Sequence, residues 1–473
     1  MVLEGKKIAV LGVGEAGRAA ARWLYGQGAE IFCCDCLRLE KWPPEFLSWC
    51  EGKRIPAVPE AVLSYEDIAG CDLAVVSPGI PFKAGLSRYF REKAVPVIGE
   101  LALAASFWPG TMIGITGTNG KTTTTSLTSH ILTCAGIPNV KAGNISPPLF
   151  DCLSQGQAVK VAVLEISSFQ LEYFPNSWPH WLKRPRFSVA AILNVAPDHL
   201  DRHGSLAEYG RCKARLFNYQ DKWDLAVIGP GLESDLCKVS AEKFFLHPKD
   251  KANPGMFLDK KRNILTIRLP DGRSDDYDLK KWRLKGSHNL ENLAAAAASA
   301  SRVGVGPDLI QNGLETFDVP GYRLQETCSR RGIVFVNDSK ATNVAALIAA
   351  LDALDGEVTL IAGGRGKGED FRRLVDFLRQ RNGNRPGVKL ANTVLIGEEA
   401  HRIKEAIEPL VRECVVIEGS NGHKVMRQAV EHAVALSSPG STVLLSPACA
   451  SFDMFSSYKE RGMVFDRIVR ELK

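Results

Sequence analysis

A glycine- and threonine-rich stretch, Thr111–Ser126 (TMIGITGTNGKTTTTS), carries residues that could bind the phosphates of a nucleotide. An apolar run ends in a turn with Gly117 and Gly120, and Lys121 and Thr122 then open a predicted helix. The backbone N–H groups of such a turn converge on an anion, and the helix N-terminus adds positive potential. Lys121 can contact the β- and γ-phosphates, and the Thr122 hydroxyl can hold Mg²⁺. Although the first glycine of the usual eight-residue pattern is missing, the order of strand, turn, Lys-Thr and helix favours a phosphate-binding loop over an ordinary turn.

A second glycine-rich turn lies near the N-terminus. The segment GVGEAG at 12–17 follows one apolar run, and the next run, AEIFCCD, ends at Asp35. This spacing is the dinucleotide-binding fingerprint, but alone it suits NAD as well as any other diphosphate-bearing ligand, such as a nucleotide sugar. A further predicted strand, Leu73–Val76, leads into Ser77-Pro78-Gly79, which is either a ligand-binding turn or a structural one.

Polar residues also end two predicted strands in the middle of the chain. Glu165 closes the apolar run at 160–166, where a carboxylate downstream of a phosphate loop can bind Mg²⁺. The run Val189–Val195 leads into PDHLDRH at 197–203, a His/Asp cluster that could ligate a metal or orient a phosphate.

Two predicted helices in this part carry polar residues of uncertain role. Lys213 lies in the helix predicted over Leu206–Phe217, and periodicity alone makes it a surface lysine. Asn289 and Asn292 lie one turn apart at the start of an alanine-rich helix. They could hydrogen-bond the edge of a base, or they could cap and solvate the helix.

The last third of the chain places three polar loops after predicted strands. The strands are Ile333–Val336, Val358–Ala362 and Val443–Leu445, and the loops read NDSKATN at 337–343, GGRGKGEDF at 363–371 and SPACASFD at 446–453. In a parallel sheet, loops of this kind gather at one edge, so they are candidates for a binding site.

The composition sets the frame for these sites. The chain has 473 residues, which suggests about three domains, and its net charge of +6 is mild and does not require nucleic acid as a partner. No apolar run reaches the ~18 residues of a membrane span, so we expect no membrane-spanning segment. The N-terminus leads straight into a predicted strand, so we expect no signal peptide. Twelve scattered cysteines favour the reducing cytoplasm. Cys33 and Cys36 form one CxxC on an apolar strand and are predicted to be small core residues.

The alternation of strands and helices predicts an α/β fold of three domains with parallel sheets. Residues 1–105 are predicted to form a Rossmann-like domain, residues 106–318 a central domain of the P-loop ATPase type, and residues 319–473 a second Rossmann-like domain. Within the central domain, the run at 260–269 predicts a hairpin-like strand region.

Several of these segments together resemble the Mur ligases, and among them the members that add D-glutamate to a cell-wall precursor. The resemblance covers essentially the full length. The first motif is shared by all Mur ligases and by folylpolyglutamate synthetase, whereas DSKATN, GGRGKGEDF and SPACASFDMF are more particular. The matching segments are TGTNGKT at 116–122, LEISSFQLE at 164–172, Asn194, HLDR at 199–202, KARLF at 213–217, NDSKATN at 337–343, GGRGKGEDF at 363–371 and SPACASFDMF at 446–455.

The resemblance implies an ATP-dependent amide ligase of peptidoglycan precursor synthesis, in the cytoplasm. The first domain would bind UDP-N-acetylmuramoyl-L-alanine, the central domain ATP and the third domain D-glutamate, in a monomer. The reaction would pass through an acyl phosphate. Around the UDP-substrate it places Gly14, Glu15, Ala16, Gly17, Asp35, Cys36, Ser77 and Gly79, with Asn144 at the muramoyl part.

The same resemblance assigns the remaining roles. Two Mg²⁺ ions are implied, one on Thr122 and Glu165 and one on His199 and a carbamylated Lys213. The catalytic residues would be Lys121, His199, Lys213 and Lys340. Around ATP it places Gly117, Thr118, Asn119, Gly120, Lys121, Thr122, Thr123, Asn289, Asn292, Arg323 and Asp338. Around the amino acid it places Thr342, Lys367, Ser451, Phe452 and Tyr458.

Three features depart from the family pattern: Tyr322 stands where a His is usual, Tyr458 stands where a Phe is common, and Pro175–Pro185 is long and rich in Trp and Pro. The nearest alternative function is a sister ligase that adds another amino acid, or glutamate to folate. A dehydrogenase that uses the turn at 12–17 would leave the phosphate loop without a purpose. A non-catalytic nucleotide sensor or scaffold is disfavoured, because Lys121, Glu165, His199 and Lys213 together count against lost activity.

Overall fold

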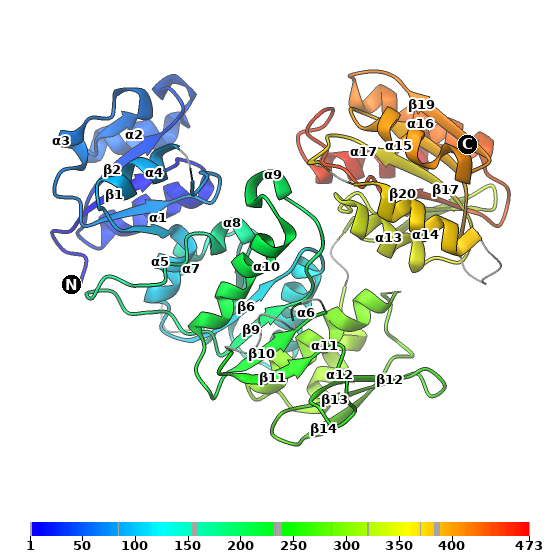
Figure 1. Cartoon of the computed structure of the whole chain (residues 1–473), viewed down its shortest axis with the longest axis horizontal. Coiled ribbons are helices and arrows are strands. Elements are labelled where there is room, and N and C mark those ends of the chain that lie inside the picture. Colours follow the sequence, from blue (N-terminus) through cyan, green and yellow to red (C-terminus); the bar gives the residue numbers. More distant parts are fainter. Residues whose placement is uncertain are drawn as a thin grey trace. The chain divides into compact units, whose positions relative to one another are not determined.

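The computed structural model describes residues 2–83, 85–153, 159–230, 232, 239–284, 286–318, 321–368, 370–382 and 388–472. The chain divides into two compact units. The first comprises Met1–Val195, Ala207–Trp282 and Glu291–Phe317, and the second comprises Ala196–Leu206, Arg283–Leu290 and Asp318–Lys473. Three sheets follow one another along the chain (Figure 1), two in the first unit and one in the second.

The first sheet is parallel, with the strand order β3-β2-β1-β4-β5. Its strands are β1 (Lys7–Leu11), β2 (Glu30–Asp35), β3 (Ala57–Pro59), β4 (Leu73–Val76) and β5 (Val97–Gly99). Its helices are α1 (Glu15–Gly26), α2 (Pro44–Lys53), α3 (Tyr65–Ile68), α4 (Gly85–Glu92) and α5 (Glu100–Phe107). The chain leaves β1 in one direction and returns on its other side at β4. A sheet with such a switch point opens a crevice between the two loops there, which is where α/β sheets bind ligands.

The second sheet has the order β14-β13-β12-β11-β10-β9-β6-β8-β7. Its strands are β6 (Thr111–Thr116), β7 (Asn139–Gly143), β8 (Val161–Glu165), β9 (Val189–Ile192), β10 (Leu225–Ile228), β11 (Glu242–Phe245), β12 (Gly255–Asp259), β13 (Ile264–Arg268) and β14 (Ser274–Asp278). The strands from β7 to β12 run parallel, whereas β13 pairs antiparallel with β12 and β14, so the predicted hairpin region is confirmed. The central strands are buried along their whole length, as expected for strands covered on both faces.

The helices of this part are α6 (Lys121–Cys134), α7 (Leu149–Leu153), α8 (Ser168–Leu171), α9 (Leu200–His203), α10 (Leu206–Ala214), α11 (Ser287–Arg302) and α12 (Pro307–Thr316). The alanines of α11 are fully buried, which confirms a packed helix at the predicted place. The helix predicted over Leu206–Phe217 is shorter than expected, because it ends at Ala214 and continues as a 3₁₀ turn at Arg215–Tyr219.

The third sheet has the order β15-β16-β20-β17-β18-β19 and is parallel except for the pair β15 and β16. Its strands are β15 (Gln325–Arg330), β16 (Ile333–Asn337), β17 (Gly356–Gly363), β18 (Val388–Ile396), β19 (Glu413–Ile417) and β20 (Thr442–Leu445). Its helices are α13 (Val344–Asp352), α14 (Arg372–Asn382), α15 (Ala400–Ile407), α16 (Gly422–Leu436) and α17 (Tyr458–Glu471). Because β20 lies between β16 and β17, the three predicted polar loops follow three adjacent strands.

The α/β class with mainly parallel sheets is confirmed, and the three sheets fall inside the three predicted ranges. The division into three domains at 105/106 and 318/319 stays a prediction. Among the described residues, no helix combines the length and the apolar character that a bilayer span needs. The segment 175–185 has no regular secondary structure, and its Trp178 indole donates a hydrogen bond to the Tyr219 hydroxyl at 3.2 Å.

Candidate active site

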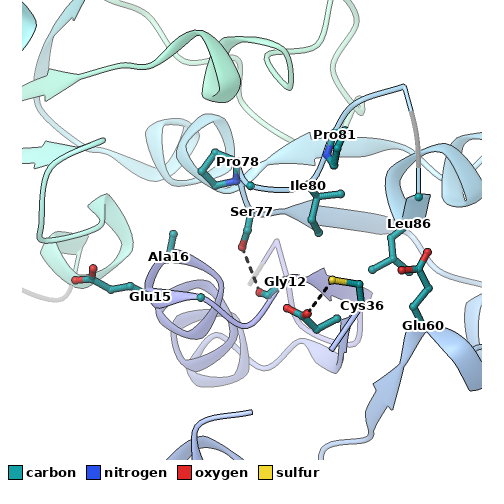
Figure 2. A pocket seen from close by; sticks show the side chains of 14 residues that line it. Gly12, Glu15, Ala16, Cys36, Glu60, Ser77, Pro78, Ile80, Pro81 and Leu86 are labelled. Atoms are coloured by element: carbon teal, nitrogen blue, oxygen red, sulfur yellow. Dashed lines mark hydrogen bonds between the residues drawn. The ribbon is translucent and has the colours of Figure 1, made fainter. Parts of the chain in front are cut away.

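The first sheet carries a cavity of about 610 Å³ at the carboxyl ends of its strands. It is lined by Gly12, Gly14, Glu15, Ala16, Asp35, Cys36, Glu60, Ser77, Pro78, Gly79, Ile80, Pro81, Gly85 and Leu86. Figure 2 shows Glu15 and Ala16 at one end of this cavity and Glu60 and Leu86 at the other. The volume lies in the range typical of small-molecule sites, and the location is the switch point between β1 and β4.

Asp35 fastens the walls of this cavity to one another. Its carboxylate accepts hydrogen bonds from the backbone N–H of Val13 at 2.8 Å and of Leu37 at 2.9 Å. The Cys36 thiol lies 3.5 Å from the same carboxylate (Figure 2). The acidic residue at the end of β2 therefore shapes the glycine turn, and one face of it remains part of the cavity wall.

The glycine turn packs closely against the loop after β4. The Ser77 hydroxyl donates to the Gly12 carbonyl at 3.2 Å, and a Cβ at Gly17 would lie 1.8 Å from that same carbonyl oxygen. Gly17 is thus required by the close approach of helix α1 to the turn and does not line the cavity. The prediction that Cys33 and Cys36 are both core residues is right for the buried Cys33 and wrong for Cys36, because β2 ends at Asp35 and leaves Cys36 exposed.

The phosphate loop has the geometry that its sequence predicts. It joins β6 to α6, and the Lys121 ammonium donates to the carbonyls of Gly117 at 2.7 Å and Thr118 at 2.8 Å. Lys121 therefore curls over its own loop. Thr122 is partly exposed at the start of α6, whereas Thr123 is buried beneath it.

Asn194, just after β9, holds this loop from the side. Its Oδ1 accepts from the Asn119 N–H at 2.9 Å, its Nδ2 donates to the Asn119 carbonyl at 3.2 Å, and its own carbonyl accepts from the Thr118 N–H at 3.0 Å. Gly120 has φ +85°, and a Cβ there would lie 2.2 Å from Oδ1 of Asn292. A glycine is therefore required at 120 on both counts.

Asn289 and Asn292 are both buried at the start of α11. The Asn292 side chain accepts a hydrogen bond from the Thr124 hydroxyl at 3.1 Å, which ties α11 to the helix that follows the phosphate loop. Asn292 therefore has a structural role, because it holds α11 against α6.

Glu165 ends β8 and is almost fully buried. Its Oε1 accepts from the Asn144 side-chain amide at 2.8 Å, while its Oε2 has no hydrogen-bond partner among the described residues. Leaving a buried carboxylate oxygen unsatisfied is costly. A divalent cation is the partner that such an oxygen most readily accepts, so the position fits the predicted magnesium ligand.

Lys213 is not the surface lysine that periodicity predicts. Lys213 is only 1% exposed, because its side chain reaches the end of β6 and the phosphate loop. The ammonium donates to the Gly117 carbonyl at 2.9 Å and lies 4.4 Å from the centre of the Tyr209 ring. A buried lysine that touches the phosphate loop is a candidate functional residue.

In the second unit, Asp338 directly follows β16 and is buried. Its carboxylate accepts from the Ser446 hydroxyl at 2.9 Å and from the Leu324 N–H at 3.2 Å. Burial raises the pKa of Asp338 to about 7. Arg323, next to Leu324, is partly exposed and lowers that pKa by its charge.

Of the predicted amino-acid-binding residues, Thr342, Lys367, Ser451 and Phe452 lie on the loops after β16, β17 and β20, and Tyr458 begins α17. The Lys340 ammonium lies 4.0 Å from the centre of the Tyr458 ring, so the tyrosine provides a cation–π contact. Tyr322 packs its ring against Gly462, where a Cβ would lie 2.4 Å from it. Ser451 is buried, whereas the neighbouring Phe452 is 64% exposed.

Lys367 lies beside Thr342, whose carbonyl accepts from its ammonium at 3.3 Å. The ammonium is also 3.5 Å from the Asp198 carboxylate, which accepts from the Asn343 amide at 3.2 Å. His199 has φ +53°, and its Nε2 lies 3.6 Å from Asp198. Among the described residues, no three His, Cys, Asp or Glu side chains cluster as a preformed metal site.

The comparison with known proteins decides the family. A family model described as "Mur ligase middle domain" matches residues 115–300, and one described as "Mur ligase, glutamate ligase domain" matches residues 322–449. The UDP-N-acetylmuramoylalanine–D-glutamate ligase of Koribacter versatilis is 36% identical over 100% of this chain and 99% of its own length. The enzyme of that name from Solibacter usitatus is 37% identical with the same coverage.

The chain belongs to the Mur ligase family.

Solved structures agree at the level of the fold. A pseudomurein peptide ligase type C from Methanothermus fervidus matches with a TM-score of 0.58 and 18% identity over 99% of this chain and 100% of its own. A UDP-N-acetylmuramate–alanine ligase from Thermotoga maritima matches with a TM-score of 0.54 and 18% identity over the same shares. Within the family, this chain is an ATP-dependent ligase that uses Mg²⁺, and the dehydrogenase and sensor readings fall away.

Some residues of these sites did not stand out in the sequence. Glu60 lines the cavity because it directly follows β3. That strand comprises only Ala57–Pro59, and its proline argues against predicting a strand there from the sequence. Ile80 and Leu86 add apolar walls that no motif marks. Asn194 belongs to a family motif, yet its role in holding the phosphate loop is visible only in the structure.

Proposed function

We propose that this chain joins D-glutamate to UDP-N-acetylmuramoyl-L-alanine at the expense of ATP, with an acyl phosphate as intermediate. The observation that carries the proposal is full-length similarity to ligases named for this reaction. The retained phosphate loop and the unsatisfied Glu165 oxygen support it, because a chain that had lost activity would not need them.

In the first step, an oxygen of the L-alanyl carboxylate attacks the γ-phosphorus of ATP, and ADP leaves. The turn at 117–120 would hold the phosphates with its N–H groups, and Lys121 would turn from the loop carbonyls toward the β- and γ-phosphates. Charge neutralisation dominates the barrier, because the attacking and transferred groups are both anionic. Arg323 and Lys340 supply further positive charge.

Magnesium, when bound, would screen the phosphate oxygens and polarise the γ-phosphorus. Glu165 and Thr122 would hold one ion. Lys213 is buried against Gly117. Addition of its neutral amine to CO₂, with loss of a proton to solvent, would give a carbamate and place an anion beside the loop. That carbamate and His199 would hold a second ion.

In the second step, the amine of D-glutamate attacks the acyl carbon, the amide C–N bond forms, and inorganic phosphate leaves as the amine loses a proton. Lys367, Thr342 and Ser451 would hold the amino acid, together with Phe452 and Tyr458. Holding the amine close to the acyl carbon can lower the activation barrier by roughly several kcal/mol.

The cavity of the first sheet would bind the UDP moiety. The N–H groups of the turn from Gly14 suit the diphosphate. The carboxylates of Asp35 and Glu60, farther along the cavity, are acceptors for nucleoside N–H and O–H groups. The cytoplasmic location and the monomeric state stay predictions.

The test is a panel of amino acids. ADP release is measured with UDP-N-acetylmuramoyl-L-alanine and, in turn, D-glutamate, L-glutamate, L-lysine and diaminopimelate. The products are identified by mass spectrometry. We expect ADP and amide in equal amounts with D-glutamate alone. Amide formation with L-lysine or diaminopimelate but not D-glutamate would favour a sister ligase and refute the proposal.

A further inference from the structure

Arg461, on the second turn of α17, is among the largest fully buried side chains of the protein, with 1% exposure. A buried arginine is unusual and is retained only when its donors are satisfied. No sequence motif marks this residue. The hydrogen bonds that its guanidinium makes therefore show which parts of the structure it holds together.

The guanidinium joins two loops that are far apart in sequence. Its Nε donates to the Ser339 hydroxyl at 3.0 Å, and its Nη2 donates to the Ser339 carbonyl at 2.9 Å. On the other side, Nη1 and Nη2 each reach the Cys449 carbonyl at 3.2 Å, and Nη1 reaches the Ala450 carbonyl at 3.4 Å. One side chain thus links the loop after β16 to the loop after β20.

The loop after β17 belongs to the same assembly. Arg365 and Ala450 exchange two backbone hydrogen bonds, at 2.9 and 3.0 Å. Gly364 packs so closely that a Cβ there would lie 2.2 Å from the Ala450 carbonyl and 3.3 Å from Nη1 of Arg461. Arg461 therefore lies where all three loops meet.

The loop after β20 contains backbone strain at the place where Arg461 binds it. Ala448 is fully buried with φ +59°, a left-handed conformation that costs a non-glycine residue about 1–3 kcal/mol. The next two carbonyls, of Cys449 and Ala450, are those that accept from Arg461. The surrounding bonds hold the strained turn in place.

Within the described residues, the hydrogen bonds of Arg461 end on hydroxyl and carbonyl oxygens and not on a carboxylate. Burial lowers the pKa of Arg461 to about 10, so the group is still cationic at neutral pH. Its positive charge therefore lies among the loops that would receive the two carboxylates of D-glutamate.

We propose that Arg461 is the positioning residue of the amino-acid site: its five-donor guanidinium fixes the loops that carry Lys340, Lys367 and Ser451 in the geometry that binds D-glutamate. The inference rests on the proposed function. It adds a residue that acts through these loops and makes no demand on the UDP cavity, which belongs to the other unit.

The test compares Arg461→Lys, which keeps the charge but loses the fork, with Arg470→Lys on an exposed face of the same helix. A third variant, Ser339→Ala, removes the hydroxyl that receives Nε and that also donates to the Tyr458 carbonyl at 2.9 Å. Kinetics are measured for each substrate separately. A merely structural arginine would lower the folded fraction, and hence kcat, without moving any KM.

For Arg461→Lys we expect the KM for D-glutamate to rise about tenfold or more, because at least two hydrogen bonds are lost. The KM for the UDP-substrate should stay within about twofold, as should every constant of Arg470→Lys, a surface change. Ser339→Ala should raise the KM for D-glutamate about three- to tenfold, because it removes two hydrogen bonds. If Arg461→Lys does not fold, the KM of Ser339→Ala decides whether the inference holds.

An unchanged KM for D-glutamate in the folded Arg461→Lys protein, or in Ser339→Ala when that alone folds, overturns the inference. The outcome is distinct from failure of the proposed function, because that failure would already be seen in the wild-type protein as a lack of D-glutamate-dependent ADP release.

Discussion

The phosphate loop of the first unit and the amino-acid loops of the second are built in opposite ways. The phosphate loop is one contiguous turn between β6 and α6, and neighbouring side chains, among them Asn194 and Lys213, fasten it. The amino-acid loops come from β16, β17 and β20, and they are joined by Arg461 from the last helix. One site is local in sequence, whereas the other exists only after the sheet has formed.

This difference explains what each region can tolerate. A contiguous loop at a helix N-terminus obtains its anion-binding power from backbone geometry, so few side chains need be fixed. Three separate loops do not share one continuous backbone, and their alignment depends on hydrogen bonds between them, from the buried Arg461 side chain and between the Arg365 and Ala450 backbones. We therefore expect changes in the first region to affect phosphate chemistry and those in the second to affect affinity for the amino acid.

The largest effect is expected at Lys213, and it tests whether the first region acts in phosphate chemistry. Lys213→Met keeps much of the buried volume but removes the amine, and with it the proposed metal ligand. Turnover should fall about a hundredfold or more, in line with the loss of a ligand-shell group, while circular dichroism stays native. Lys222→Met, at an exposed lysine, is the control. Turnover close to wild type would make Lys213 a structural residue.

The next largest effect concerns Glu165→Gln. The amide oxygen can still accept from Asn144, but the charge of the unsatisfied Oε2 is lost. The Mg²⁺ concentration needed for half-maximal ADP release should rise about 10- to 100-fold. Glu100→Gln, at another buried glutamate, should leave that concentration unchanged. An unaltered magnesium titration in Glu165→Gln would remove this residue from the metal site.

Asn194→Ala should have a moderate effect confined to ATP. It removes two side-chain hydrogen bonds that hold Asn119, worth about 1 kcal/mol each, so the KM for ATP should rise about tenfold. The matched control is Asn392→Ala, which removes a buried amide bonded to Thr359 and Leu436 in the third sheet. If both variants changed the KM for ATP equally, the distinction between the two regions would be lost.

The smallest effect is one of stability alone. Burial raises the pKa of Glu100 to about 7, and its partner Gln170 donates to it at 3.2 Å. Between pH 4.5 and 7 the unfolded chain has already lost this proton while the folded chain retains it, so native stability falls as pH rises through that window. Glu100→Gln should therefore gain stability at pH 8, on the order of 3 kcal/mol at most, and little at pH 5. Thermal unfolding at the two pH values measures this, and an equal change at both would contradict it.

The sequence predicted the contiguous features well. The phosphate loop, the turn at 12–17 and the strand Leu73–Val76 lie where expected, since each depends on neighbours in the chain. Periodicity was wrong about Lys213, because its side chain is buried against the phosphate loop, a tertiary contact that the pattern of neighbouring residues does not show. The family resemblance, which rests on matched positions, nevertheless singled it out.

The second region could be predicted only in part. The rule that polar loops gather at the ends of parallel strands found its three loops. The sequence could not show that β20 inserts between β16 and β17, nor that Arg461 reaches a serine 122 positions away. Arginine is usually a surface residue, and only packing shows that this one is buried.

The central claim is that the γ-phosphoryl group of ATP, held at the phosphate loop of the first unit, is transferred to the alanyl carboxylate before the amine attacks. It is tested most directly with UDP-N-acetylmuramoyl-L-alanine whose alanyl carboxylate carries ¹⁸O in both positions. Turnover with ATP and D-glutamate should place one ¹⁸O in each phosphate released and leave one in the amide. Phosphate free of label, with amide still formed, would contradict the account.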